Sequence, residues 1–225
     1  MREIEHFSEG SKAENLSARC PLCGGDAELF IEMPDKTYHR CGRCLGIFLD
    51  REYFVSPAAE KRRYEEHKND IHDPRYQEFV GPIVSKIQER FTNKHRGLDY
   101  GAGTGPVIAK LLRDKGYSIE LYDPFFWNDA TVLDATYDFV VCCEVIEHFH
   151  SPAKEFKRLR SLLKPGGALY CMTDLYSEDT DFKNWYYKND PTHVFFYKKN
   201  TLEWIKKQLG FVSFEQKDRI TLFSN

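Results

Sequence analysis

The sequence predicts an α/β fold: a mostly parallel sheet with helices on both faces, an antiparallel hairpin strand near its C-terminal end, and a small cysteine-rich segment before it. Three observations support this prediction. Short apolar runs alternate with helical patterns along residues 97–225, an order typical of parallel sheets. A glycine-rich loop, residues 101–105, joins one such run to a helix. Two closely spaced pairs of cysteines precede this region.

The composition is that of a globular protein. Of the 225 residues, 41% are hydrophobic and 30% are charged, which excludes a disordered chain and a membrane-spanning one. No run approaches the ~18 apolar residues that a spanning helix needs, and the charged first residues do not read as a signal peptide. We therefore expect a cytoplasmic location and no membrane partner. The net charge of -3 gives no general attraction to phosphate backbones, so nucleic acid is not an expected partner.

The cysteine-rich segment has the spacing of a structural zinc site. Two C-x-x-C pairs, Cys20 with Cys23 and Cys41 with Cys44, are separated by 17 residues. Four thiolates leave no open position on the metal, so we expect a zinc ribbon with a structural role and not a catalytic one. A pair of disulfides or a site that has lost its metal are the alternatives. Three basic against five acidic residues between Cys20 and Asp50 favour a substrate-covering or partner-binding ribbon over one that binds nucleic acid.

Two helices are expected between the ribbon and the sheet. Ser56 and Pro57 begin a charged helix over roughly residues 57–69, whose charges indicate a solvated linker. A strong apolar stripe then predicts a helix over residues 76–91. Gly81 and Pro82 interrupt it, so we expect a kink or two abutting helices there.

The glycine loop has the residue types of a nucleotide-binding turn. Residues 97–106 read Gly-Leu-Asp-Tyr-Gly-Ala-Gly-Thr-Gly-Pro, a D-x-G-x-G-x-G pattern. Glycines allow positive φ and a close approach of a ligand to the backbone, and Pro106 suits the first position of a helix whose free amides face that ligand. The pattern is not a dinucleotide fingerprint, because the third glycine of G-x-G-x-x-G would fall on Pro106.

Four motifs in order resemble class I S-adenosylmethionine-dependent methyltransferases. They are residues 99–105 of the glycine loop, Asp123 after a second apolar run, Glu-Val-Ile-Glu-His at residues 144–148 after a third, and Leu-Lys-Pro-Gly-Gly at residues 163–167 before a fourth. The resemblance covers roughly residues 74–225 and implies a Rossmann-like class I methyltransferase fold with S-adenosylmethionine as cofactor. A glycine-rich turn in an unrelated α/β protein is the alternative.

The resemblance implies a set of cofactor-binding residues. Asp123 would accept hydrogen bonds from both ribose hydroxyls, unless it only forms a turn before Pro124. Glu144 would lie near the methionine portion, and Asp134 is the candidate for the adenine, although the segment 127–137 is shorter than the family usually has. The complete set is Asp99, Tyr100, Gly101, Ala102, Gly103, Gly105, Asp123, Pro124, Asp134, Glu144 and His148. Glu147 and His148 could equally hold the loop, and the aromatic residues 125–127 could stack on adenine or pack in the core.

The remaining segments complete the sheet and a substrate region. We expect a buried strand over residues 139–143, a helix from Ser151, a strand over residues 168–173, a last helix from Asn200 to Gly210 and a hairpin of residues 211–215 and 220–223 at the sheet edge. The long aromatic segment 174–199 is assigned to substrate recognition. Within it His193 resembles a substrate-proximal histidine of small-molecule methyltransferases, and it acts as a general base or holds the loop.

The domain prediction is a flexible tail (1–18), a zinc-ribbon-like segment (19–55), a helical linker and lid (56–96) and an S-adenosylmethionine-binding methyltransferase domain (97–225). The predicted function is methyl transfer to a small-molecule acceptor by in-line displacement. Alternatives are a methyltransferase for RNA or protein that docks through the ribbon, a non-catalytic S-adenosylmethionine-binding protein and, least favoured, a nicotinamide oxidoreductase. The acceptor, the methylated atom and the oligomeric state are not predicted.

Overall fold

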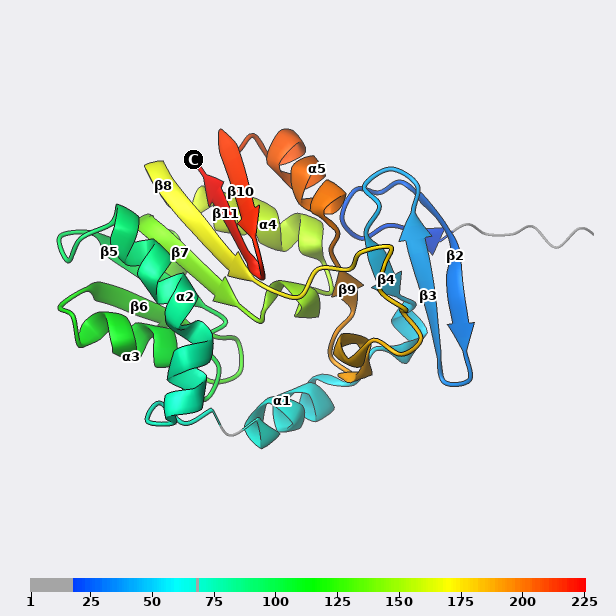
Figure 1. Ribbon diagram of the computed structural model, residues 1–225, viewed down its shortest axis with the longest axis horizontal. Coiled ribbons are helices and arrows are strands. Elements are labelled where there is room, and N and C mark those ends of the chain that lie inside the picture. Colours follow the sequence, from blue (N-terminus) through cyan, green and yellow to red (C-terminus); the bar gives the residue numbers. More distant parts are fainter. Residues whose placement is uncertain (1–17, 68) are drawn as a thin grey trace, which may run out of the picture.

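The computed structural model describes residues 18–67 and 69–225, and they form two sheets joined by helices and a long loop (Figure 1). Residues 1–17, nearly all of the tail expected from the sequence, lie outside the described residues. Helices pack against the larger sheet, and the smaller sheet lies beside this layered region (Figure 1).

The larger sheet has six strands in the order β10-β11-β8-β7-β5-β6. Its parallel part consists of β6 (Ser118–Tyr122), β5 (Arg96–Tyr100), β7 (Tyr137–Cys143) and β8 (Leu163–Met172). β11 (Ile220–Ser224) pairs antiparallel with β8, and β10 (Ser213–Lys217) pairs with β11. The predicted mostly parallel α/β fold is confirmed. The antiparallel strand β11 lies inside the sheet, and its hairpin partner β10 forms the edge.

Alternate residues of the central strands build two separate apolar cores. Phe139 and Val141 of β7 pack with α2 (Pro74–Arg90) and α3 (Val107–Arg113). Val140 and Cys142 point to the opposite face and pack with α4 (Pro152–Ser161) and α5 (Lys199–Leu209). This arrangement explains why β7 is an uninterrupted apolar run, since a parallel strand with helices on both faces is buried on both sides. The free cysteines of β7 and β8 are packed in the same layers.

Helix α2 passes through Gly81 and Pro82 as one helix, so the expectation of two abutting helices is wrong. Proline cannot donate the hydrogen bond that the carbonyl of Glu78 would accept in a regular helix. Glu78 and Pro82 are both exposed, so water can bind this carbonyl, while Val80 and Ile83 remain in the core.

Two helix starts differ by a residue or two from the sequence prediction. Pro106 is the N-cap of α3, one residue ahead of the expected first helical position. α5 starts at Lys199, and the hydroxyl of Thr201 accepts a hydrogen bond from the amide of Lys198. α5 ends as predicted, at Gly210 with a φ of 74°.

The smaller sheet has the order β1-β2-β3-β4-β9, and its last strand comes from a distant part of the chain. β1 (Ala18–Arg19), β2 (Asp26–Met33), β3 (Lys36–Cys41) and β4 (Ile47–Leu49) form the ribbon. β9 (Phe195–Phe196) belongs to the long aromatic segment and pairs antiparallel with β4. The ribbon is therefore joined by backbone hydrogen bonds to the region that the sequence assigns to substrate recognition.

Residues on both sides of β4 pack against the rest of the protein, whereas much of β2 is exposed. The ribbon cysteines and Phe48 belong to the apolar core that contains α4 and α5. Tyr38, Ile47 and Leu49 form a third core with residues of the segment 176–196. The ribbon is thus part of one continuous packing arrangement with the α/β region, as its position in Figure 1 also shows.

Short elements connect these parts. The 3-10 helices are η1 (Arg51–Tyr53), η2 (Ala130–Asp134), η3 (Ile146–His148) and η4 (Tyr186–Asn189), and α1 (Pro57–Glu66) lies between the ribbon and α2. η2 occupies the short segment 127–137, so β6 is an edge strand. Among residues 18–67 and 69–225, every helix is too short or too polar to cross a bilayer. The cytoplasmic location stays a prediction.

Candidate functional site

A cavity of about 790 Å³ opens at the carboxyl ends of the parallel strands. Its walls come from the loops after β5, β6 and β7, from the aromatic segment, and from α1 and the start of α2. In open α/β sheets this edge is where ligands bind. The volume lies in the range of small-molecule pockets.

The glycine loop forms one end of the cavity. Gly101 has a φ of 84°, and a Cβ atom there would lie 2.5 Å from a methyl carbon of Val145. Gly103 has a φ of 60°, and its amide donates a hydrogen bond to the Asp123 carboxylate at 3.0 Å. Residues other than glycine rarely adopt such φ values, so the loop depends on glycine at these positions. The open turn brings backbone groups to the cavity surface.

Asp123 lies opposite this loop and is tightly held. Its Oδ1 accepts hydrogen bonds from the amides of Phe125 and Phe126 at 2.8 Å and 3.1 Å, and the indole of Trp127 donates to the carbonyl of Gly103 at 2.8 Å. Oδ1 thus already accepts two hydrogen bonds, whereas Oδ2 accepts one, from the amide of Gly103, and has a lone pair left for a ligand hydroxyl. Asp123 is therefore both a turn residue and a potential ligand contact.

Glu144 lies at the end of β7 in a strained backbone conformation. Its φ is 53°, in the left-handed region that residues with a Cβ rarely adopt. Nη2 of Arg219 donates to both carboxylate oxygens, at 2.8 Å and 2.7 Å. Burial raises the pKa of Glu144, and the Arg219 guanidinium opposes that rise. The hydroxyl of Tyr187 lies 3.2 Å from Oε2. Glu144 is thus fixed at the cavity wall.

Glu147 lies behind the wall and is fully buried. The hydroxyls of Thr173 and Tyr187 donate to its carboxylate, the former at 3.1 Å. Burial raises the pKa of Glu147 to about 8, with a further contribution from Glu144. Its main-chain carbonyl accepts a hydrogen bond from the amide of Val194 at 2.9 Å. The residue therefore connects η3 to the aromatic segment.

Two histidines lie side by side in the cavity wall, with ring centroids 4.7 Å apart. Nδ1 of His148 is 3.0 Å from the carbonyl oxygen of Thr192, and Nδ1 of His193 is 2.6 Å from that of Tyr187. Burial lowers the pKa of His148 to about 3 and that of His193 to about 4. Both rings are therefore neutral near pH 7.

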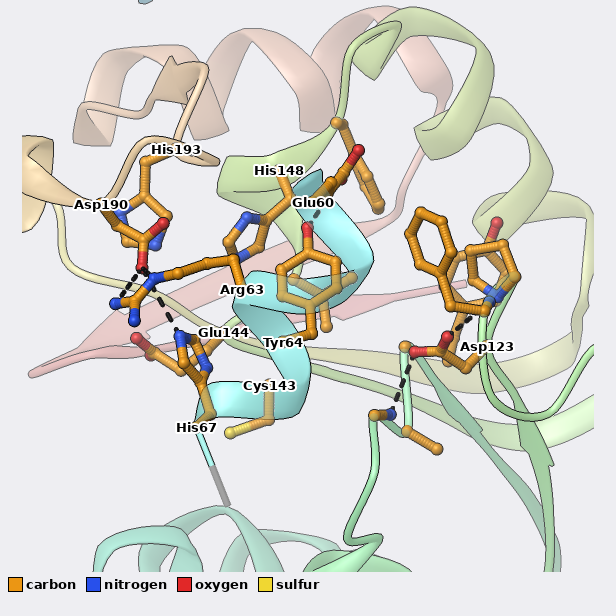
Figure 2. A pocket seen from close by; sticks show the side chains of 18 of the residues that line it. Glu60, Arg63, Tyr64, His67, Asp123, Cys143, Glu144, His148, Asp190 and His193 are labelled. Carbon is orange, nitrogen blue, oxygen red and sulfur yellow. Dashed lines mark hydrogen bonds and ion pairs between the residues drawn. The ribbon is translucent and has the colours of Figure 1, made fainter. Parts of the chain in front are cut away.

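Helix α1 crosses the cavity and connects its two ends. Figure 2 shows the helix passing between Asp123 on one side and Asp190 and His193 on the other. Arg63 donates from Nε and Nη2 to Oδ2 of Asp190 at 3.0 Å and 2.8 Å. Burial raises the pKa of Asp190, but hydrogen bonds from His67, Thr192 and Arg63 outweigh it and hold that pKa well below its usual range. The carboxylate is therefore ionised and holds α1 in place.

Comparison with known proteins decides the family. A family model described as a methyltransferase domain matches residues 72–216, more than half of the chain. The chain belongs to the methyltransferase-domain family. The resemblance to class I S-adenosylmethionine-dependent methyltransferases is thereby confirmed.

Curated relatives match a part of this chain. The "Ubiquinone biosynthesis O-methyltransferase" proteins of Sodalis glossinidius and Serratia proteamaculans are 29% and 28% identical to it over 93 residues. Those residues are 41% of this chain and 37% and 39% of the relatives. The match thus spans well under half the length of these curated relatives.

Solved structures share the fold of this chain. The 1,6-didemethyltoxoflavin-N1-methyltransferase of Burkholderia thailandensis, solved with 1,6-didemethyltoxoflavin and S-adenosylhomocysteine, superposes with a TM-score of 0.53 at 15% identity. That superposition covers 88% of this chain and 99% of the other. A SAM dependent methyltransferase from Archaeoglobus fulgidus gives a TM-score of 0.50 at 22% identity, over 62% of this chain and 71% of the other.

The cavity brings together most of the residues that the sequence assigned to the cofactor or to catalysis. Those that line it are Tyr100, Gly101, Ala102, Gly103, Asp123, Pro124, Glu144, His148 and His193. Their individual roles stay predictions.

Three predicted cofactor residues lie elsewhere. Asp99 is buried under the loop, where burial raises its pKa to about 7 and the amide of Ala109 donates to it. Gly105 faces Asn69, whose carbonyl oxygen would lie 1.8 Å from a Cβ atom at this position. Asp134 is exposed in η2 and is not among the residues that line the cavity. Asp99 and Gly105 thus shape the loop from behind.

Sequence reasoning missed the contribution of α1. The charged pattern of residues 57–69 indicated a solvated linker, yet four of its residues line the cavity: Glu60, Arg63, Tyr64 and His67. The hydroxyl of Tyr64 donates to Glu60 at 2.7 Å, and Glu60 is buried. These four lie at spacings of three and four residues, so one helix face carries them all. This spacing in the sequence could have indicated that one face of α1 contributes to the site.

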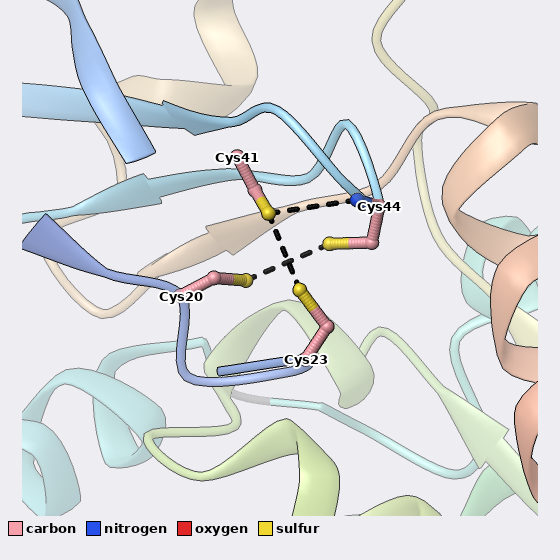
Figure 3. Close-up of side chains that lie close together, drawn as sticks. All are labelled: Cys20, Cys23, Cys41 and Cys44. Carbon is pink, nitrogen blue, oxygen red and sulfur yellow. Dashed lines mark hydrogen bonds between the residues drawn. The ribbon is translucent and has the colours of Figure 1, made fainter. Parts of the chain in front are cut away.

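The four cysteines predicted to bind zinc converge on one point (Figure 3). Their sulfurs lie within 4.8 Å of one another, with 3.5 Å between Cys20 and Cys44 and 3.2 Å between Cys23 and Cys41. Sulfurs around a tetrahedral zinc with bonds of about 2.3 Å are separated by about 3.8 Å, so the residues fit this metal. All four cysteines are free, so the disulfide alternative is not what the structure contains.

Main-chain amides support thiolates at this site. The amide of Gly25 donates to the sulfur of Cys23 at 3.4 Å, and the amide of Arg43 donates to that of Cys41 at 3.3 Å. The hydrogen bond between Cys20 and Cys44 lowers the pKa of Cys20 and raises that of Cys44, as expected for one thiolate beside one thiol. Donors aimed at sulfur stabilise the deprotonated form that binds metals. The cysteine cluster is therefore suited to a zinc ion.

Proposed function

We propose that this protein transfers a methyl group from S-adenosylmethionine to a hydroxyl group of a small molecule. The observation that carries the proposal is the single cavity with the glycine loop and Asp123 at one end and the histidine pair at the other. A cavity of about 790 Å³ has the size of a small-molecule pocket, which favours a small acceptor over RNA or a protein surface. The names of the curated relatives, O-methyltransferases of ubiquinone biosynthesis, favour oxygen as the accepting atom.

The residues at the glycine-loop end fit the methyl donor. Gly101 and Gly103 keep the backbone open, and Oδ2 of Asp123 can accept a hydrogen bond from a ribose hydroxyl. Pro124 and Phe125 lie beside it as an apolar wall. Glu144, held by Arg219, would face the ammonium group of the methionine portion. Asp134 remains the sequence-based candidate for the adenine.

Alignment is the main task of the protein chain. S-adenosylmethionine supplies an electrophilic methyl group on a positively charged sulfur. The walls formed by α1 and the aromatic segment hold the acceptor so that its oxygen approaches the methyl carbon in line, at about 3–3.5 Å. Tyr64 and Tyr187 lie on these walls. His193, at the same end, assists loss of the acceptor's proton.

The zinc ribbon has a structural role in this proposal. β9 is held by β4, and the segment that carries β9 also carries His193 and Asp190. A metal that orders β4 therefore orders the acceptor end of the cavity.

Binding of the donor tests the proposal directly. Calorimetric titration of the zinc-loaded protein with S-adenosylhomocysteine is expected to show one site, with affinity at least about tenfold lower in Asp123→Ala, a loss of about 1.4 kcal/mol. Asp129→Ala is the matched control, because Asp129 is exposed and only begins η2. Labelled donor incubated with a panel of phenols and alcohols then measures transfer. No heat with donor or demethylated donor would refute the proposal.

A further inference from the structure

Glu147, His148 and His193 form a cluster at the acceptor end of the cavity, and the donor contacts proposed at the glycine-loop end involve none of the three, although the resemblance counted His148 among the cofactor residues. One potential ligand atom from each residue lies within 4.8 Å of the others. Nε2 of His193 is 4.0 Å from Oε1 of Glu147, too far for a hydrogen bond. Two ligand atoms bound to one metal ion at about 2.1 Å lie about 3–4 Å apart. The spacing therefore fits groups bridged by an ion better than groups bonded to each other.

Both histidines are oriented as metal ligands usually are. Nδ1 of each ring faces a main-chain carbonyl oxygen, which requires the proton on Nδ1 when the ring is neutral. Nε2 then carries a lone pair. Within the described part of the chain, no hydrogen bond engages Nε2 of His148 or His193. A bond from Nδ1–H to a carbonyl is the usual way in which a protein fixes a metal-binding imidazole.

Glu147 supplies a buried carboxylate whose hydrogen-bond donors are neutral hydroxyl groups. Its hydrogen bonds come from the hydroxyls of Thr173 and Tyr187, which fix the carboxylate as supporting groups fix a ligand. Among the described residues, no lysine or arginine nitrogen lies within ion-pair distance of the Glu147 carboxylate. Arg219 pairs instead with Glu144 and Asp174. A buried carboxyl group without a cationic partner is kept neutral by a proton, and it is ionised when a cation or a metal ion lies beside it.

We propose that Glu147, His148 and His193 bind one divalent transition-metal cation at the acceptor end of the cavity. Two imidazoles and one carboxylate are a ligand set for Zn²⁺, Mn²⁺, Fe²⁺ or Co²⁺, and three protein ligands leave coordination positions open. Those positions face the cavity, since both histidines line it while Glu147 lies behind them. This site is separate from the four cysteines, which offer sulfur alone.

The role of the cation rests on the proposed methyl transfer. An acceptor hydroxyl that binds the cation becomes more acidic and releases its proton to water in the cavity. An oxygen lone pair then forms the bond to the methyl carbon, and the carbon–sulfur bonding pair moves to sulfur, which becomes neutral. The products are the methylated oxygen, S-adenosylhomocysteine and one proton. His193 assists loss of the acceptor's proton by binding the ion that makes the hydroxyl more acidic. It does not accept that proton itself.

Metal binding can be measured without donor or acceptor. The full-length protein is loaded with one zinc per chain, which occupies the thiolate site, and is titrated with Mn²⁺ while the spectrum of free Mn²⁺ is followed by electron paramagnetic resonance. Thiolates prefer zinc to manganese, so the ribbon does not take up the probe. We expect one Mn²⁺ per chain, with affinity at least about tenfold lower in His193→Gln and in Glu147→Gln.

His150→Gln is the matched control. His150 is another histidine of the same loop that lines the cavity, but it faces Glu60 and Phe54 and not the cluster. It is expected to bind Mn²⁺ like the unmodified protein. Absence of Mn²⁺ binding by the folded, zinc-loaded unmodified protein would overturn the proposal, as would unchanged affinity in both cluster variants. Because the titration contains no donor, failure of methyl transfer would leave this result intact.

The second readout is the dependence of turnover on the added ion. Removing Mn²⁺ with a chelator that leaves the ribbon zinc in place is expected to lower single-turnover methylation at least tenfold, with S-adenosylhomocysteine affinity unchanged. Full turnover with ribbon zinc alone would contradict the role assigned to the ion. A protein that binds Mn²⁺ but transfers no methyl group would instead count against the proposed function.

Discussion

Gly46 of the ribbon lies directly against the ring of Phe195 in β9: a Cβ atom on Gly46 would come within 2.4 Å of the Phe195 Cζ atom. The adjacent residues pair in register, Ile47 with Phe196 and Phe48 with Phe195. A contact this close between segments almost 150 positions apart joins the ribbon to the acceptor end of the cavity.

Gly46→Ala is therefore expected to separate β4 from β9. The added methyl group has no space, so the strands must move apart and the acceptor wall must shift with them. We expect a lower melting temperature and a KM for the acceptor raised several-fold, with donor affinity nearly unchanged. Gly42→Ala is the control, because its Cβ atom would meet nothing closer than 3.9 Å. Equal effects of the two substitutions would contradict the coupling.

Removal of the ribbon metal is expected to disorder the same region. Metal analysis should find one zinc per chain, and Cys41→Ser should lower that content, because structural zinc contributes directly to the folding energy of small domains. Hydrogen exchange at residues 36–49 and 194–197 should rise together in this variant. Cys171→Ala, a buried cysteine outside the cluster, should keep its zinc. Fast exchange confined to the ribbon would argue against coupling through β9.

Gly101→Ala is expected to impair donor binding more than it impairs folding. The new Cβ atom would meet Val145 at 2.5 Å and would be held at a φ of 84°, so the loop must change shape. S-adenosylhomocysteine affinity should fall at least about tenfold, equivalent to about 1.4 kcal/mol. Gly210→Ala has a similar φ, 74°, but open space around its Cβ atom at the end of α5. It should lower stability by about 1 kcal/mol and leave donor binding intact.

Arg63→Ala tests whether α1 is held over the cavity by Asp190. Loss of the two hydrogen bonds should free this end of α1 and raise the KM for the acceptor several-fold, with a small change in melting temperature. Arg62→Ala, an exposed neighbour on the same helix, should behave like the unmodified protein. Identical kinetics for the two variants would show that α1 does not depend on this pair.

Asp99 is expected to make stability decrease with rising pH. Its pKa is raised from 3.8 to about 7 by burial, so the folded state keeps a proton that the unfolded state releases between about pH 4 and pH 7. Stability therefore falls across this window, by at most about 4 kcal/mol for a shift of this size. Asp99→Asn stays neutral and should lack this contribution. Urea unfolding of both proteins from pH 4.5 to 8 measures the difference, and parallel curves would refute it.

Local patterns in the sequence were enough to predict the helices and strands, the glycine loop and the cysteine cluster. The strands, the helices and the loop near Gly101 depend on hydrophobic period and on glycine, both of which act over a few neighbouring residues. The spacing of Cys20, Cys23, Cys41 and Cys44 implied a metal site, since two short turns bring each pair together on their own. Asp123 followed from its place at the end of a strand, because parallel strands end at a common edge.

Only the tertiary structure decided how distant segments meet. The pairing of β4 with β9 and the ion pair of Arg63 with Asp190 could not be predicted from local sequence patterns. Both join residues more than 120 positions apart. The same holds for Glu147 and His193: each was visible as a candidate in the sequence, but their separation and the free Nε2 atom depend on main-chain carbonyls that folding brings to them. The sequence alone thus determined which groups the protein has, and packing determined which of them act together.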